Sequence, residues 1–140
     1  MKVNPATAVP SAPVEMPGAV GCRVRWLIGR PEGAPNFAMR EFEVQPGGYT
    51  PKHSHDYEHE VYILDGAGVV LEGDAEHPVG PGSVVYVAPN EVHQFRNTGD
   101  AALKFLCLIP HIDGVSPPAA GSSSAANGAP PALASGAKMC

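Results

Sequence analysis

Three histidines, His53, His55 and His59, lie within seven residues of one another, and His93 follows on a separate predicted strand. Neutral imidazole is the commonest metal ligand in proteins. In an extended segment the rings of His53 and His55 point to the same side, because strand side chains alternate with a period of two. His59 keeps the same parity. The spacing therefore predicts one metal site with His53, His55, His59 and His93 as its ligands.

Glu60 is the alternative donor to His59, because it stands one residue further along the chain. Alternation along a strand favours His59, which shares a face with Val61 and Ile63 and leaves Glu60 on the opposite face. We therefore predict His59 as the inward ligand, with Glu60 pointing outward.

The remaining histidines, His77 and His111, are interpreted as surface or hydrogen-bonded residues. His77 stands beside Pro78 in an expected turn, and His111 stands at the edge of the C-terminal segment. A lone histidine is more often of this kind than a metal ligand.

The segments that must position the cluster are all predicted strands. Short apolar runs separated by Gly, Pro, Asn and Asp occur at residues 24–28, 37–44, 60–64, 68–71, 84–87, 92–96 and 103–109. No pattern with a period of 3.6 competes with them. At least seven short strands at close intervals predict an all-β sandwich or barrel.

Three glycine-containing segments are expected to be turns or loops. Asp65-Gly66 and Gly73-Asp74 are predicted hairpin-type turns, because glycine supplies the positive φ that such turns need. The strand 37–44 is expected to end at Pro46-Gly47-Gly48. That segment either brings the backbone into the mouth of the barrel or is an ordinary loop.

Composition divides the 140 residues into three parts. Residues 1–21 contain several prolines without apolar periodicity and are predicted to be a flexible N-terminal segment. Residues 113–140 lack aromatic residues and large aliphatic runs, so they cannot bury enough apolar surface to offset the entropy of ordering. We expect a disordered tail there and one folded barrel over residues 22–112.

Charge and composition exclude several classes of partner. The formal net charge is −5 with only nine Lys and Arg, which argues against a nucleic-acid surface. We see no apolar stretch that could span a membrane and no N-terminal signal segment. Three widely spaced cysteines do not form a disulfide framework, so free thiols and a cytoplasmic location are expected.

Two motifs in the chain resemble the cupin superfamily. The first reads Gly47-x5-His53-x-His55-x3-His59-x6-Gly66, and the second reads Gly82-x5-Ala88-x-Asn90-x2-His93-x3-Asn97. Ala88 and Asn90 depart from the usual Pro and Gly of the second motif, although Pro89 keeps the turn. His59 stands where most members have a ligand glutamate.

This histidine makes the chain resemble a narrower group, the small single-domain bacterial cupins with an all-histidine site. The resemblance implies a double-stranded β-helix, or jelly-roll barrel, with one divalent ion held by the four histidines. It implies manganese as the first choice for this ion and iron as the second. Copper, nickel and zinc are also possible, because imidazole binds them as well. The resemblance also implies a homodimer. Four neutral ligands would leave the ion its full charge and make it a stronger Lewis acid.

The candidate pocket residues are Arg40, Tyr57, Phe95, Phe105 and Cys107. Strand parity places Phe95 on one face with His93 and Asn97, Phe105 with Cys107, and Arg40 with Ala38, Phe42 and Val44, a row that the resemblance implies is inward. Tyr57 is a candidate because it lies between the ligand histidines. Arg40 either points inward, orienting an anionic substrate or contacting a ligand, or is a solvated arginine paired with Glu41 or Glu58. Tyr57 is either a lid residue or a surface aromatic. Phe95 and Phe105 fit a barrel core, a substrate pocket or both. Cys107 is either a small buried hydrophobe or a ligand or redox partner.

The predicted function is that of a metal-dependent cupin, an oxidoreductase of the dioxygenase type acting on a small, largely apolar substrate. The resemblance to manganese cupins that cleave substrates oxidatively motivates this hypothesis. Two alternatives stay open. One is Lewis-acid chemistry such as isomerisation, which needs a general acid or base in the pocket. The other is a non-catalytic cupin that binds or senses a metal or a small molecule.

Overall fold

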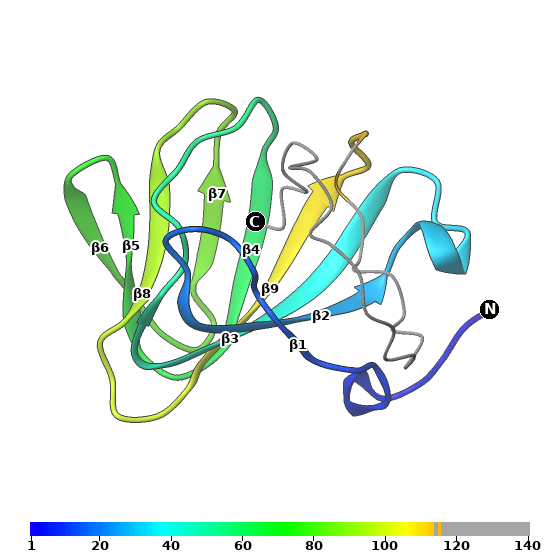
Figure 1. The fold of residues 1–140 in the computed structure, drawn as a ribbon, viewed down its shortest axis with the longest axis horizontal. Helices are drawn as coiled ribbons and strands as arrows, with labels where there is room; N and C mark the ends of the chain where they lie inside the picture. The colour runs from blue at the N-terminus through cyan, green and yellow to red at the C-terminus, as the bar shows by residue number, and fades with distance from the viewer. Residues whose placement is uncertain (114, 116–140) are drawn as a thin grey trace, which may run out of the picture.

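The computed structural model describes residues 1–113 and 115, and these residues form an almost entirely β structure (Figure 1). The elements are η1 (Ala6–Ala8), β1 (Ala12–Pro13), β2 (Val20–Ile28), η2 (Arg30–Glu32), β3 (Phe37–Tyr49), β4 (His59–Asp65), β5 (Gly68–Glu72), β6 (Ala75–Val79), β7 (Val84–Val87), β8 (His93–Asn97) and β9 (Leu103–Pro110). The predicted all-β fold class is confirmed. Among the described residues, no helix is long and apolar enough to cross a membrane.

The strands form one antiparallel sheet with the order β6-β5-β8-β3-β9-β4-β7. β2 lies outside this order and pairs with the edge of β3 that does not pair with β9. The long β3 joins the two halves, since it pairs with β9 along Phe37 to Val44 and with β8 at Tyr49. Figure 1 shows the sheet curled, with β6, β5 and β8 at the left and β4, β9 and β2 towards the right. The curl gives the sheet an inner face that builds the core.

Alternation fills that inner face as the sequence predicts. In β4 the side chains of His59, Val61 and Ile63 are buried, whereas Glu60 and Tyr62 are exposed. The other inner rows are Ala38, Arg40, Phe42 and Val44 of β3, His93, Phe95 and Asn97 of β8, and Leu103, Phe105, Cys107 and Ile109 of β9. The predicted parity of all four strands is confirmed.

The predicted end of the strand at Pro46-Gly47-Gly48 is wrong, because β3 continues to Tyr49. Val20 pairs with Tyr49 and Cys22 with Val44, so extra residues of β3 are accommodated in an irregularity of the ladder. A Cβ at Gly48 would lie 2.5 Å from the Val20 carbonyl oxygen. Glycine therefore allows the close approach of the two backbones.

One predicted hairpin is confirmed and the other is wrong. Gly73-Asp74 joins β5 to β6, with Glu72 opposite Ala75 and Gly73 at φ +60°. Asp65-Gly66 does not close a hairpin, because β4 pairs with β7 and β9 while β5 pairs with β6 and β8. The chain crosses at this point from one half of the curled sheet to the other.

His77 lies in β6 rather than in the expected turn. The strand was missed because Pro78 interrupts its pattern. β6 is an edge strand, where a residue without an N–H does not break the ladder. The imidazole of His77 contacts the Glu72 carboxylate at 2.9 Å and is exposed, so its interpretation as a surface residue is confirmed. His111 contacts the Ala34 carbonyl oxygen at 2.6 Å, as expected of a hydrogen-bonded histidine.

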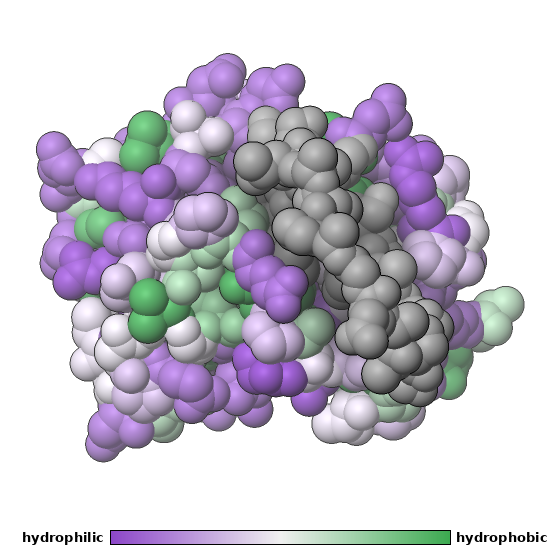
Figure 2. Space-filling model, in the orientation of Figure 1, coloured by the Kyte–Doolittle hydropathy of each residue, from purple (hydrophilic) through white to green (hydrophobic). Residues whose placement is uncertain are grey.

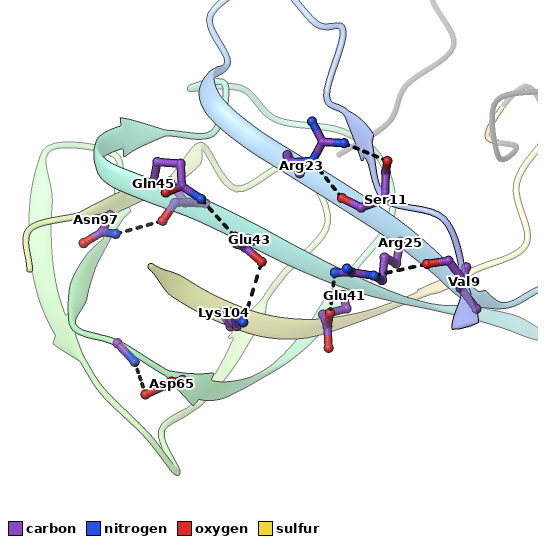
Figure 3. Close-up of polar contacts among 12 residues, drawn as sticks. Val9, Ser11, Arg23, Arg25, Glu41, Glu43, Gln45, Asp65, Asn97 and Lys104 are labelled. Atoms are coloured by element: carbon purple, nitrogen blue, oxygen red, sulfur yellow. Dashed lines mark hydrogen bonds and ion pairs between the residues drawn. The ribbon is translucent and has the colours of Figure 1, made fainter. Parts of the chain in front are cut away.

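Two arginines of β2 hold the segment that precedes it (Figure 3). Arg23 donates to the Ser11 hydroxyl and carbonyl oxygens at 2.9 and 2.8 Å, and Arg25 donates to the Val9 carbonyl oxygen at 3.2 Å. The predicted N-terminal segment, residues 1–21, thus contains η1, β1 and the first residues of β2. Its flexibility stays a prediction. Of the predicted disordered tail, residues 113–140, all but Asp113 and Val115 lie outside the described residues.

Figure 2 shows hydrophilic residues over most of the margin of one face, with hydrophobic residues visible mainly near its centre and in small separate patches. Larger apolar side chains are exposed on the outer face of β4 and β7, where Tyr62 is opposite Val84 and Tyr86 is opposite Glu60. This outer apolar face lies on the opposite side of β4 from His59.

Candidate metal centre

One loop and two strand ends bring the four predicted histidines together. His53 and His55 follow β3, His59 opens β4, and His93 opens β8. His53 and His93 form an isolated β-bridge, with N–O distances of 3.2 and 2.9 Å in the two directions. The Asn90 N–H donates to the His55 carbonyl oxygen at 2.6 Å. Backbone hydrogen bonds therefore hold the first histidine segment against the residues that surround His93.

The ligand atoms of His53, His55 and His93 all lie within 4.8 Å of one another. The ring of His59 lies 4.4 Å from that of His55 and 5.1 Å from that of His93, measured between ring centroids. Its Nε2 is 2.6 Å from His55 Nε2. The structure thus groups three predicted ligands directly and places the fourth beside two of them.

The hydrogen-bond partners of the Nδ1 atoms determine which ring nitrogens are available to a metal ion. His55 Nδ1 donates to the Tyr57 carbonyl oxygen at 2.7 Å, and His93 Nδ1 donates to the Glu91 carbonyl oxygen at 2.9 Å. A neutral imidazole carries one proton, so Nε2 of each ring keeps its lone pair. Carbonyl partners of this kind fix the tautomer of metal-binding histidines.

His59 has a different outer environment. Its Nδ1 lies 3.1 Å from Cys107 Sγ and 3.5 Å from Arg40 Nη2. Arg40 Nη2 also donates to Cys107 Sγ at 3.0 Å. Arg40 of β3 and Cys107 of β9 are directly opposite each other in the ladder, which explains why their side chains meet behind His59.

Arg40 is completely buried, so its interpretation as a solvated arginine is wrong. Its guanidinium lies 5.4 Å from the Trp26 ring centroid and 5.0 Å from that of Phe42. Aromatic faces attract a cation and can partly replace water around it. Glu41 pairs instead with Arg25, at 3.1 Å.

Aromatic side chains close the interior next to the histidines. Phe105 stacks against Phe42 at 5.3 Å and against Phe95 at 4.7 Å, measured between centroids. Tyr57 stacks on His55 at 3.8 Å and is buried, so its interpretation as a surface aromatic is wrong. These rings keep the histidines in a mostly apolar surrounding.

Two hollows reach the histidine cluster. A cavity of about 20 Å³ is lined by Arg40, Phe42, Thr50, His53, His59, His93, Phe95, Phe105 and Cys107. A groove of about 480 Å³ runs between the β5–β6 hairpin and β7, and His93 and Glu91 lie at its inner side. The small cavity has room for little more than a water molecule, whereas the groove is large enough for an organic ligand.

Burial keeps His59 and His93 neutral. It lowers the pKa of His59 far below the usual range, and the positive charge of Arg40 lowers it further. Burial also lowers the pKa of His93. Because coordination requires deprotonated imidazole, both histidines are ready to bind a metal at neutral pH. The donor set of neutral nitrogens therefore fits a divalent ion of the kind that imidazole prefers.

Sequence reasoning identified the four clustered histidines and left Arg40 open between two positions, but it missed Trp26 and the direct contact between Cys107 and His59. Phe42 was placed in the same row as Arg40 but was not named as a pocket residue. The contact of Cys107 depends on how β3, β4 and β9 are aligned in the sheet. That alignment is not encoded in the period of any single strand.

Comparison with known proteins matches residues 40–109 to the family model described as Cupin domain. The solved structure of the polyketide cyclase RemF from Streptomyces resistomycificus is 38% identical, covers 79% of both chains and has a TM-score of 0.75. The 1-methylthio-D-xylulose 5-phosphate methylsulfurylase of Rhodospirillum rubrum is 41% identical over 71 residues, which are 51% of this chain and 46% of the relative.

The Oxalate-binding protein of Thermotoga maritima is 35% identical over 68 residues, which are 48% of this chain and 56% of the relative. The chain spans about half the length of these two curated relatives. The matched segment begins at Arg40 and ends at Ile109, so it contains all four histidines and the buried contacts around them. With this match and the likeness to RemF over most of both chains, the protein belongs to the cupin family.

Proposed function

We propose that the protein is a metal-dependent cupin enzyme that promotes ring closure of a small, largely apolar polyketone without net oxidation. The likeness to the polyketide cyclase RemF over 79% of both chains carries this proposal. A groove that leads from the surface to His93 and can accept an organic substrate supports it. His53, His55, His59 and His93 would hold the ion, with manganese as our first choice and iron as the second.

An ion held by these nitrogens supplies Lewis-acid polarisation of a carbonyl group. The protein supplies the surroundings. Phe42, Phe95 and Phe105 exclude water from the inner side of the histidines, and Val79, Val85 and Val87 of the groove would pack against apolar parts of the substrate. Arg40 lies behind His59, and its positive charge helps to keep that imidazole neutral and able to bind the ion.

A dioxygenase acting on a similarly apolar substrate is the second candidate. The closed aromatic surroundings of the histidines favour it, because they would protect a reactive oxygen species from water. The two candidates use the same residues. They differ in whether oxygen is consumed.

The test is to load the purified protein separately with Mn²⁺, Fe²⁺ and Zn²⁺ and incubate it with a small synthetic poly-β-ketone. Ring closure should give a product lighter by one water molecule, with no oxygen uptake and with activity in the zinc form. His55→Ala should abolish the reaction. Oxygen uptake that matches product formation would instead identify the dioxygenase, and no turnover with any ion would favour the binding or sensing cupin.

We also propose that the protein forms a homodimer, with the outer apolar face of β4 and β7 at the interface. Tyr62, Val84 and Tyr86 are largely exposed there, and large exposed apolar patches commonly mark interaction surfaces. Light scattering should give twice the chain mass, and Tyr86→Glu should give the mass of a single chain.

A further inference from the structure

The outer ring nitrogen of His59 has neighbours different from those of His55 and His93, whose tautomers are fixed by backbone carbonyls. His55 and His93 both donate from Nδ1 to carbonyl oxygens, which leaves Nε2 of each ring with a lone pair. His59 Nδ1 instead lies against Cys107 Sγ and Arg40 Nη2. The tautomer of His59 therefore depends on a thiol and a guanidinium.

The proton of His59 has two possible positions in this environment. With the proton on Nε2, His59 donates to the lone pair of His55 Nε2 at 2.6 Å, and Nδ1 is an acceptor. With the proton on Nδ1, its lone pair on Nε2 faces the other histidines, and Nδ1 needs an acceptor. Only the second tautomer of neutral imidazole can offer Nε2 to a metal ion.

Cys107 Sγ is the only one of the two outer neighbours that can accept that proton. A guanidinium has no acceptor atom, so Arg40 cannot receive a hydrogen bond from Nδ1. Sulfur can accept weakly and is 3.1 Å from Nδ1. Arg40 Nη2 donates to the same sulfur at 3.0 Å, which fixes its position and leaves the thiol hydrogen to point elsewhere, such as towards the Leu108 carbonyl oxygen 4.0 Å away.

We propose that Cys107, held in place by Arg40, is a positioning residue that selects the metal-binding tautomer of His59. The sulfur accepts the Nδ1 hydrogen, as backbone carbonyls do for His55 and His93. When the site is empty the proton of His59 sits on Nε2, and loading the site transfers it to Nδ1 with no net change in the charge of the ring. The proposal rests on the metal site of the proposed function but not on the reaction.

The test compares metal affinity in Cys107→Ser, Cys107→Ala and wild-type protein, measured with Zn²⁺ against a chromophoric chelator. Partners of ligand histidines typically contribute about 10- to 100-fold to metal affinity. We expect a loss of that size in Cys107→Ala, which has no acceptor. Cys107→Ser, which keeps an acceptor, should recover most of the loss.

Cys22→Ala is the matched control, because Cys22 is also a buried thiol but its sulfur contacts the backbone carbonyl oxygens of Tyr49 and Val20. It should lower the melting temperature of the metal-free protein without changing zinc affinity. Should Cys107→Ala fail to fold, Cys107→Val replaces it as an apolar side chain of similar size.

Nitrogen-15 spectra of the histidine rings give the readout that a packing role would not change. Wild-type protein should show the His59 proton on Nε2 without zinc and on Nδ1 with zinc. In Cys107→Ala the Nδ1 hydrogen of the zinc form should exchange with solvent faster than in Cys107→Ser. Equal zinc affinity in the serine and alanine variants, or a His59 tautomer that is the same with and without zinc, would overturn the proposal. If the wild-type protein does not cyclise the poly-β-ketone but the zinc affinities and tautomers are as expected, the proposed function is contradicted and this inference still holds.

Discussion

The inner rows of β3, β4 and β9 have opposite chemistry at their two ends. The histidine end contains His59, Arg40 and Cys107 together with the other site histidines. The aliphatic end contains Val44, Ile63 and Leu103, all fully buried. The stacked rings of Phe42 and Phe105 lie between them. The same alternation places both ends inside, so the difference in chemistry arises only from position along each strand.

This difference suggests a division of roles. Buried aliphatic groups stabilise the fold by leaving water, whereas buried polar groups contribute little net stability even when they are hydrogen-bonded. The aliphatic end should therefore determine folding, and the histidine end should determine binding. Four measurements test this division of roles.

Leu103→Ala should have the largest effect on stability. Leu103 is fully buried opposite Val44, and removing a buried leucine side chain typically costs about 2–5 kcal/mol of unfolding free energy. Urea unfolding of the metal-free protein measures the loss, and zinc affinity should not change. Leu106→Ala, on the outer face of the same strand, is the control and should cost less. Equal losses would show that the aliphatic end has no special role.

His55→Ala should reverse this pattern. Metal affinity should fall by at least about 100-fold, or about 2.7 kcal/mol, because a ligand matters at least as much as its hydrogen-bond partners. The metal-free protein should unfold at nearly the same urea concentration as wild type. His77→Ala is the control, since His77 is exposed on β6 and contacts Glu72 rather than the site histidines. A large loss of metal-free stability in His55→Ala would contradict the division of roles.

Acid should destabilise the metal-free protein through the histidine end. Burial lowers the pKa values of His59 and His93 in the folded state, so the unfolded chain binds more protons once the pH falls below about 6.5. Stability should be constant with respect to these groups above that pH. Below it, His59 should remove about 1.4 kcal/mol per pH unit, and His93 should add to the loss until the pH reaches its own lowered pKa. Urea midpoints between pH 7 and 5 measure the slope, which should decrease in His93→Gln. If the slope in His93→Gln equals that of the wild type, the loss of stability in acid does not arise from His93.

Gly73→Ala should have the smallest effect and serves as a reference outside both ends. Gly73 has φ +60° in the β5–β6 turn, and the added methyl group would meet no heavy atom within 4 Å. The left-handed backbone alone should cost about 1 kcal/mol. Thermal unfolding should show this loss, and zinc affinity should be unchanged. A change in zinc affinity would mean that the turn, rather than the histidine end, influences the site.

Much of this contrast could be predicted from the sequence because alternation is a local property. The parity of the segments around His59, Arg40 and Cys107 correctly grouped the side chains that share a face. The partners of these residues could not be predicted in the same way. Arg40 was compatible with both an inward and a solvated position, and only the pairing of β3 with β9 brings it to Cys107.

The errors concern turns and edges, where short patterns have more than one structural meaning. Asp65-Gly66 has the composition of a hairpin turn, but the strands on either side of it prefer other partners. Gly73-Asp74 has similar composition and does close a hairpin. Pro78 obscured β6, although proline is tolerated on an edge strand. Non-local pairing decides these cases.

The position of β9 has a consequence for the life of the newly made chain. β9 is the last strand of the described residues, and it pairs both with β3, which precedes His53 and His55, and with β4, which begins at His59. Pairs between distant segments form late in folding, because the intervening chain must first lose its freedom. A ribosome-bound chain that lacks β9 has neither Cys107 nor the neighbour that holds β3 beside β4. We therefore expect metal uptake to follow the synthesis and pairing of β9, so that a loaded site marks a molecule in which β3, β4 and β9 are already joined.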